Sequence, residues 1–388
     1  MKTPSLAARI LRRWLPPLLL LVLFLGFVVH INQVNKVELV SRTGQTFEKG
    51  VVTEILQDNL QADGSRVGEQ RVKVRMTTGV RAGQEIETTS SSGYLFGAGC
   101  TTGMKVIVMQ SVAGDTTISS VYSQDRGAVI VIFAALYLLV LCLVGGKQGI
   151  KGALGLIFTF LCIMYVYLPL VYKGWSPFWV SVLVCVITTA VTLYLIGGPT
   201  KKTLIATGGT VAGVIIAGIA ASLFSMASGI TGWNVSDIES LLTLANTSGV
   251  QVGGLLFSGL LISSLGAVMD VAMSICSAIG ELYTHDPSLS RRALFRAGMH
   301  VGRDMMGTDS NTLILAFAGG SISMLVLDYA YDLPLLQVLN SNNIGIAVMQ
   351  GLSGSFGIVL AVPVTVLLAV LLYPHSKRSA GHANHTEP

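Results

Sequence analysis

Residues 128–145 read AVIVIFAALYLLVLCLVG, a stretch of 18 residues without a charge. A helix of this length is long enough to cross about 30 Å of hydrocarbon. Comparable apolar stretches occur before and after it along the chain. They cover residues 14–31, 152–172, 175–197, 203–228, 250–283, 308–328 and 344–373. The pattern predicts a polytopic α-helical membrane protein with about eight transmembrane helices.

The composition and the placement of positive charge agree with this prediction. Apolar residues make up 52% of the chain and charged residues only 12%, whereas a soluble domain carries about a quarter charged residues. Lysine and arginine cluster on alternate sides of the predicted spans, and the short loops of the opposite side hold only Lys173. By the positive-inside rule, we expect both termini in the cytoplasm. The cytoplasmic set is Arg9, Arg12, Arg13, Lys147, Lys151, Lys201, Lys202, Arg291, Arg292, Arg296, Arg303, Lys377 and Arg378.

The first apolar stretch has two interpretations. Residues 1–31 are either a cytoplasmic tail with a membrane anchor or a cleaved signal peptide. Residues 24–31 read FLGFVVHI and contain no small-x-small cleavage site, which favours the anchor. The remaining helices fall in residues 127–374, and residues 375–388 form a short tail.

Residues 32–126 differ from the rest of the chain. They hold 10 basic and 10 acidic residues. Residues 71–76 read RVKVRM, the alternation of a half-buried strand. Further short strands are expected at 37–40, 50–56, 85–88, 105–109 and 117–122, with turns at Gly44, Gly64, Gly79, Gly83 and Gly103. We therefore predict a small β-rich domain of OB or SH3-like type, outside the membrane between the first two helices. It is interpreted as a spacer or docking module, with a ligand-binding role as the alternative.

The sixth apolar stretch contains a carboxylate, Asp270, among mostly apolar neighbours. A charge at membrane depth costs a few kcal/mol by insertion scales, so this group is protonated, paired or in contact with water. Helical spacing places polar and small residues on one stripe: Ser263, Gly266, Asp270, Ser274, Ser277 and Glu281. A functional role is favoured for Asp270 over a structural hydrogen bond, whereas a structural role is favoured for Glu281.

More polar residues lie at the expected entry to the seventh span. Arg303 is interpreted either as an ordinary cytoplasmic charge or as a counter-charge for a carboxylate. Asp304 and Asp309 are expected near a helix N-terminus, where their charge is favourable. Asn311 and Thr312 lie deeper and can hydrogen-bond across helices.

The sequence contains no complete motif of the enzyme classes considered below. Gly351, Leu352, Ser353 and Gly354 match part of a serine-hydrolase pattern, but the sequence offers no histidine base at membrane depth. The glycines there are expected to let another helix approach closely. There is no GxxxxGK[ST] or HExxH motif and no CxxC pair. We expect no enzyme activity, no cofactor, no metal and no nucleic-acid partner.

Three segments resemble the YibE/F family of bacterial membrane proteins. They are Gly266–Ser274 (GAVMDVAMS), Gly302–Thr308 (GRDMMGT) and Ser310–Ala316 (SNTLILA). Asp309 lies at a position where the resemblance implies a neutral residue. The resemblance implies a bacterial cytoplasmic membrane protein with an anchor, an external domain and a block of helices. It implies no substrate.

The same region is similar, more distantly, to SecD/SecF and the RND superfamily. There, a mid-membrane Asp precedes an Arg-bearing helix start by about thirty residues, and these groups serve proton flow. The resemblance implies that Asp270 carries protons and that Arg303 modulates it. Two additional helices relative to SecF and a smaller external domain depart from that pattern.

The leading hypothesis is a transporter or permease-like protein coupled to protons through Asp270, moving a small solute, an ion or a protein. One rival is a scaffold or accessory factor of envelope or protein translocation, whose external domain binds a protein. A second rival is a passive channel. Besides the bilayer, we expect a protein partner for the external domain and self-association of the chain.

Overall fold

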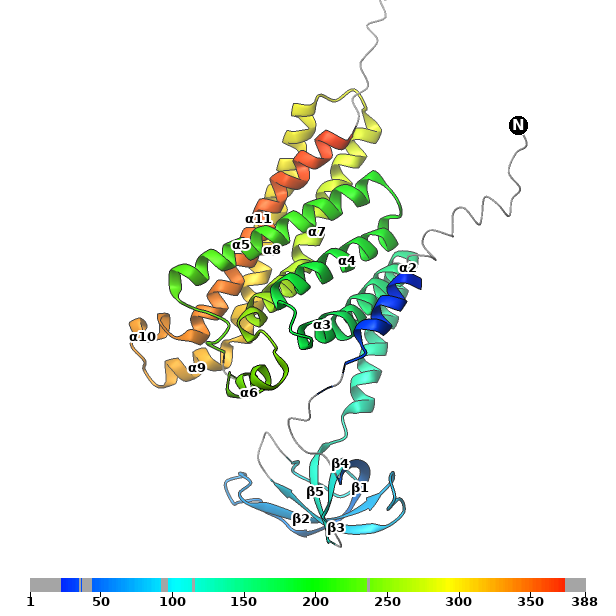
Figure 1. Cartoon of the computed structure of the whole chain (residues 1–388), viewed down its shortest axis with the longest axis vertical. Coiled ribbons are helices and arrows are strands. Elements are labelled where there is room, and N and C mark those ends of the chain that lie inside the picture. Colours follow the sequence, from blue (N-terminus) through cyan, green and yellow to red (C-terminus); the bar gives the residue numbers. More distant parts are fainter. Residues whose placement is uncertain are drawn as a thin grey trace, which may run out of the picture. The chain divides into compact units, whose positions relative to one another are not determined.

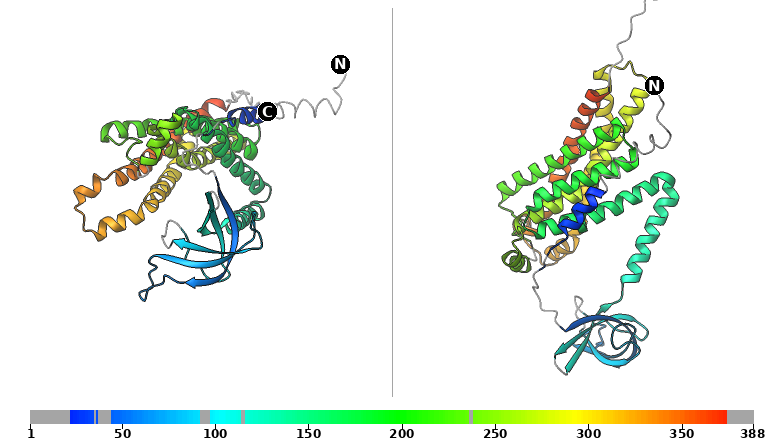
Figure 2. Two further views of the ribbon diagram at one scale, coloured as in Figure 1. Left: turned by 60° about the horizontal axis from the view of Figure 1, so that its bottom comes forward. Right: turned by 45° about the vertical axis from the view of Figure 1, so that its right-hand side comes forward.

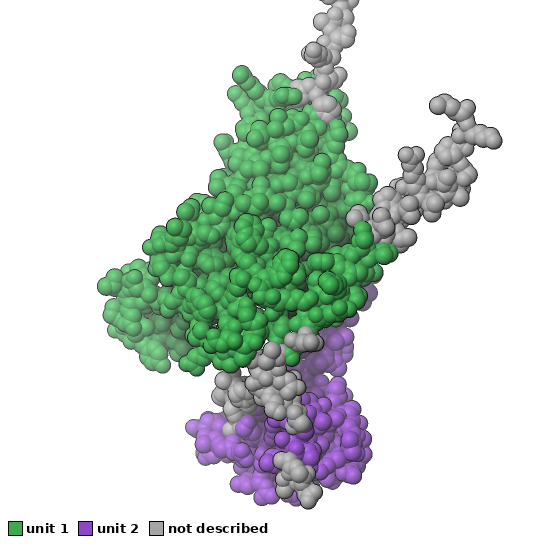
Figure 3. Space-filling model, in the orientation of Figure 1, with its two compact units in different colours: residues 1–37, 144–388 green, residues 38–143 purple. Residues whose placement is uncertain are grey.

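The computed structural model describes residues 22–34, 36, 44–91, 97–113, 116–235 and 238–373. The chain forms two compact units, which Figure 3 shows in different colours. Residues 38–143 make up one unit, and residues 1–37 with 144–388 make up the other. The smaller unit contains the β-domain, and the larger unit contains most of the helices.

Five strands close into a barrel in the smaller unit (Figure 1). They are β1 (Gln45–Gln57), β2 (Glu69–Met76), β3 (Glu85–Ser91), β4 (Lys105–Ala113) and β5 (Thr116–Gln124). Their order around the barrel is β1-β2-β3-β5-β4, and β4 pairs again with β1. Only β3 and β5 pair in parallel among these strands. This confirms the predicted small β-domain, and a closed five-stranded barrel fits the OB alternative.

The alternating residues of β2 give the strand one face in the barrel core and one face outside it. Val72, Val74 and Met76 are buried in its core, while the basic residues between them face outward. Lys73 pairs with Glu54 at 2.9 Å on the outside of the sheet. The five predicted turn glycines all have a positive φ of 79–86°, a conformation that costs glycine little. The strand predicted at 37–40 lies outside the described residues.

Most of the described helices follow the barrel in the sequence. They are α2 (Gly127–Cys162), a π-helical turn (Ile163–Tyr167), α3 (Leu168–Tyr172), α4 (Pro177–Gly197), α5 (Lys201–Ser228), α6 (Ile238–Ser248), a 3₁₀ turn (Val252–Gly254), α7 (Leu255–His285), α8 (Arg291–Gly320), α9 (Ile322–Ala330), α10 (Leu335–Leu339) and α11 (Asn342–Leu372). A further short apolar helix covers Val22–Ile31, at the end of the predicted first span. Residues 14–21 of that span lie outside the described residues.

Helix α11 organises the larger unit (Figure 2). It packs most extensively against α5 and α8, and also against α7. Small residues make the close approach to α5 possible. A Cβ placed on Gly357 would lie only 2.7 Å from the carbonyl oxygen of Gly213. The prediction that glycines here admit a neighbouring helix is confirmed, because a Cβ on Gly354 would lie 2.5 Å from Leu313 of α8.

Five helical segments in the described residues are long and apolar enough to span a membrane, or six if α8 and α9 form one bent span. The segment Gly127–Tyr172 has 46 residues and is interrupted at Gly146, where φ is 53° and ψ is −132°. The two spans predicted at 128–145 and 152–172 fall on either side of this break. The total of eight spans stays a prediction.

The helix that carries the predicted seventh span, 308–328, begins well before that apolar stretch. Helix α8 begins at Arg291, with the Ser290 hydroxyl accepting a hydrogen bond from the Ala293 amide. It ends at Gly320, and the chain then bends by 58° into α9. Hydropathy locates an apolar stretch but does not detect a helix that begins in polar sequence, so it does not locate the start of α8.

Candidate functional site

Asp270 lies at the centre of α7, with 15 helical residues on each side. At 1.5 Å per residue it is about 22 Å from either end of the helix, and half the hydrocarbon thickness is about 15 Å. Helix α7 contacts α4, α5, α8 and α11, yet the Asp270 side chain is exposed. The carboxylate is therefore at the middle of a helix long and apolar enough to span a membrane, and these neighbours do not enclose it.

The predicted polar stripe is present on α7 as a continuous unburied surface. Ser263, Gly266, Asp270 and Glu281 are exposed, and Ser274 and Ser277 are half-buried. The opposite side of the helix is packed into the core, where Val268, Val271 and Ile275 are fully buried. Two of the stripe's hydroxyls donate within α7: Ser263 to the Leu260 carbonyl at 3.0 Å and Ser277 to the Met273 carbonyl at 2.7 Å. Asp270 is the one carboxylate of the stripe at mid-helix.

Helix α8 runs antiparallel to α7 and brings a second carboxylate to it. A Cβ on Gly298 would lie 2.6 Å from Ile279, and one on Gly302 would lie 3.2 Å from Ile275. Seven residues beyond Gly302, or almost two helical turns, Asp309 lies on the same side of α8. Its carboxylate is close enough to Asp270 for the two charges to interact.

Asp309 itself is half-buried, and one of its oxygens, Oδ2, is buried without a hydrogen-bond partner among the described residues. The neighbouring Ser310 hydroxyl is buried in the same unpartnered state. Ser355 of α11 donates to the Gly351 carbonyl at 2.8 Å and lies 3.4 Å from the Ser310 carbonyl. Ser310 and Ser355 were not predicted as site residues. The Asp309–Asn311 run of three polar residues was the available signal.

The placement of Asp304 and Asp309 near a helix N-terminus is wrong. Because α8 begins at Arg291, both residues lie in its interior, on its fourth and sixth turns. A favourable interaction with the helix dipole falls off within the first turn. It therefore does not explain either carboxylate.

Arg303 does not lie on the same side of α8 as Asp309. It is one residue beyond the buried Gly302, about 100° further around the helix, and its side chain is exposed. Within the described part of the chain, Arg303 forms no ion pair. It instead lines a surface pocket with Phe295, Arg296, Met299 and His300. Its role as counter-charge to Asp270 stays a prediction.

The other predicted residues of α8 lie on its exposed side. Asp304, Asn311 and Thr312 are exposed, and Thr312 donates a hydrogen bond to the Thr308 carbonyl at 2.9 Å. The structure thus brings Asp270 and Asp309 together and leaves these three on the outer surface. In the described ranges, no group of three His, Cys, Asp or Glu residues is arranged to hold a metal ion.

The segment that contains this site is also the segment that matches known sequences. A family model described as YibE/F-like protein matches residues 133–375, which includes α7, α8 and α11 in full. No curated protein and no solved structure matches the chain. Since the match covers more than half of the 388 residues and the apolar helices fit an integral membrane protein, the chain belongs to the YibE/F-like family.

Proposed function

We propose that this protein is a transporter-like permease of the bacterial cell membrane and that protons exchange at the Asp270–Asp309 pair. The observation that carries the proposal is the Asp270 carboxylate at the centre of α7. Its side chain is exposed on the surface of the helical bundle and is close enough to the Asp309 carboxylate for the two charges to interact. In this proposal the chain crosses the membrane several times, with both termini in the cytoplasm.

The cost of charge at membrane depth supports this choice. An aspartate facing lipid at the helix centre costs about 2.5–3.5 kcal/mol by insertion scales, and a second carboxylate within electrostatic range adds like-charge repulsion. A proton held by the pair removes part of that cost, and contact with water removes more. A carboxylate pair that has a low free-energy cost at membrane depth only when it holds a proton or contacts water is suited to proton exchange.

The test is proton flux into proteoliposomes that contain the full chain, followed with a pH-sensitive dye under an imposed gradient. Asp270→Asn is expected to reduce the flux at least tenfold. If the two carboxylates act as one unit, Asp270→Asn combined with Asp309→Asn is no worse than Asp270→Asn alone. Asp332→Asn is the matched control, because Asp332 is exposed in the turn after α9 and asparagine tolerates its φ of 51°.

Two results would contradict the proposal. One is a wild-type protein that carries no proton flux above empty vesicles. The other is an Asp270→Asn protein that is inserted, folded and as active as the wild type. Conductance in planar bilayers without proton coupling would identify a passive channel instead.

A specific feature of the barrel favours a second candidate, a scaffold that binds a protein partner. Phe47 and Tyr122 contact each other edge to face, with ring centroids 5.2 Å apart. Both side chains are nearly half exposed on the outside of the barrel. Paired exposed aromatics are typical of interface anchors. Under this alternative, Phe47→Ala with Tyr122→Ala abolishes partner crosslinking in cells, while Asp270→Asn has no effect.

A further inference from the structure

The first half of α8 is rich in positive charge. Four arginines and a histidine occur within its first 13 residues, and the sequence has no acidic residue between Pro287 and Arg303. All five side chains are exposed, and none of the four arginines forms an ion pair with a described residue. The five are Arg291, Arg292, Arg296, His300 and Arg303.

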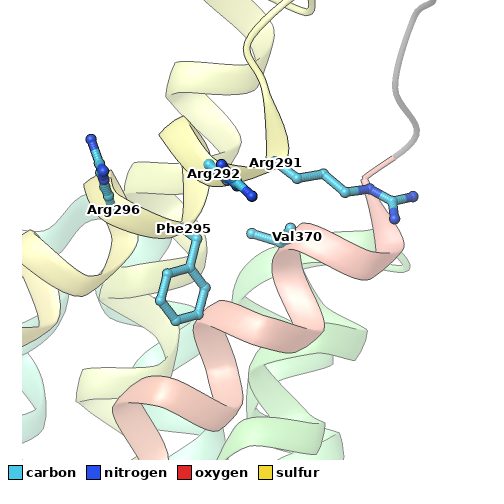
Figure 4. Close-up of a pocket in the computed structure, with 5 residues that line it drawn as sticks. All are labelled: Arg291, Arg292, Phe295, Arg296 and Val370. Atoms are coloured by element: carbon cyan, nitrogen blue, oxygen red, sulfur yellow. The ribbon is translucent and has the colours of Figure 1, made fainter.

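Two adjoining pockets lie along this basic surface and share Phe295 and Arg296. The first, of about 290 Å³, is lined also by Arg291, Arg292 and Val370 (Figure 4). In Figure 4 the arginines project from α8, and Val370 comes from the neighbouring α11. The second, of about 400 Å³, is lined by Met299, His300 and Arg303 beyond the shared residues.

The pockets are lined mostly by apolar surface, and the arginines of α8 place guanidinium groups beside it. Guanidinium groups provide a planar fork of donors that matches phosphate oxygens in bidentate fashion. Phe295, Met299 and Val370 add apolar surface directly beside those donors. A ligand that fits both features has a phosphate group joined to an apolar chain.

The surroundings of the pockets have the composition expected at a membrane interface. Helix α11 ends beside them at Leu372, and its last two turns expose Leu367, Leu371 and Leu372, an apolar surface suited to lipid. Tyr283 and Tyr373 form a ring pair at the same end of the bundle, with centroids 5.0 Å apart. Tyrosines are enriched at the headgroup level of membranes.

We propose that the basic half of α8 binds the phosphate headgroup of an anionic glycerophospholipid, with its glycerol and upper acyl chains against Phe295 and Val370. Basic pockets between membrane helices on the cytoplasmic side recognise such headgroups. The proposal rests on the membrane location of the bundle, and it does not depend on proton exchange at Asp270.

The experiment is native mass spectrometry of the full-length protein in detergent, titrated with phosphatidylglycerol or phosphatidylcholine. We expect phosphatidylglycerol to bind at least tenfold more tightly. Arg292→Gln with Arg296→Gln is expected to remove that preference, whereas Arg292→Lys with Arg296→Lys retains part of it. Lys201→Gln with Lys202→Gln is the matched control, because it removes two positive charges from the start of α5 outside the pockets.

Three results would overturn the inference. The first is equal binding of the two lipids by the wild type. The second is an unchanged preference in the folded glutamine variant. The third is displacement of bound phosphatidylglycerol by inorganic phosphate at matched concentration, which would identify a soluble anion as the ligand. Asp270→Asn leaves lipid binding unchanged, so failure of this inference is distinguishable from failure of the proposed function.

Discussion

The close crossing of α5 and α11 allows a quantitative prediction for Gly357→Ala. A Cβ at this position would lie 2.7 Å from the Gly213 carbonyl oxygen and 2.8 Å from the Ala217 Cβ. Since ordinary heavy-atom contacts need about 3.5–4.0 Å, the two helices must separate by roughly 1 Å. The first obstacle is backbone, so no side-chain rotation relieves the clash.

Two opposing terms set the size of the effect. Overpacking of a well-packed core costs about 1–3 kcal/mol, and alanine gains about 0.5–1 kcal/mol over glycine inside a helix. The expected net loss in the free energy of unfolding is about 0–2.5 kcal/mol, whereas the expected difference from an alanine variant without the clash is the full overpacking cost of about 1–3 kcal/mol. Gly259→Ala is the matched control on α7, because no atom lies within 4 Å of its added Cβ. That variant is expected to be as stable as the wild type or slightly more stable.

The assay is reversible unfolding of the full chain in mixed micelles with increasing dodecyl sulfate, followed by circular dichroism. The measured quantity is the difference in unfolding free energy between the two alanine variants. Equal stability of Gly357→Ala and Gly259→Ala would refute the packing argument, because the variants share their helix propensity and differ only in the space available.

Three further predictions concern one polar network in the barrel. The Arg66 side chain donates to Asp58 at 2.6 Å and holds the pKa of that carboxyl below its usual value. The ionised Asp58 carboxyl therefore stabilises the barrel fully above the pKa that this group has in the unfolded chain. This stabilisation is lost as the pH falls through the lower pKa of the folded state. Asp58→Asn should therefore weaken the dependence of hydrogen exchange on acid pH in residues 58–71 of the full chain. Gln70 is buried and exchanges two hydrogen bonds with the Cys100 backbone, at 2.8 and 3.0 Å. Gln70→Leu should destabilise the barrel by about 1–3 kcal/mol, measured by the same exchange experiment, and an unchanged exchange rate would contradict this. Burial raises the pKa of the Cys100 thiol. Alkylation of this thiol at pH 8 should therefore be at least about tenfold slower in the folded protein than in urea, measured by peptide mass spectrometry. Equal rates would place the thiol outside the core.

Much of the fold could be predicted because it depends on local pattern. Strand β2 was predicted from alternation alone, because its buried residues are spaced by two. The turn glycines were predicted because a positive φ favours glycine wherever the chain reverses. The apolar helices followed from the cost of leaving apolar side chains in water. Asp270 was found for the same reason, since a lone carboxylate interrupts an apolar helix.

The rest required contacts between residues distant in sequence. The first turns of α8 read RRALFRAG, a polar segment that hydropathy assigns to a loop, and the Ser290 cap with packing on α7 and α11 makes it helical. The sequence suggested Arg303 as a counter-charge for a carboxylate and Asp309 as a residue near a helix N-terminus. On the helix they point in different directions, which leaves Arg303 in a surface pocket and Asp309 beside Asp270.

The sequence by itself determined the membrane character of the chain, the barrel strands and the polar stripe of α7, because hydropathy and periodicity are properties of single elements. Only the tertiary structure decided that Asp309 lies within electrostatic range of Asp270 and that arginines of α8 line a shallow pocket beside α11. These pairings depend on the relative rotation and register of packed helices. That geometry is fixed by interdigitating side chains such as Ile275 against Gly302.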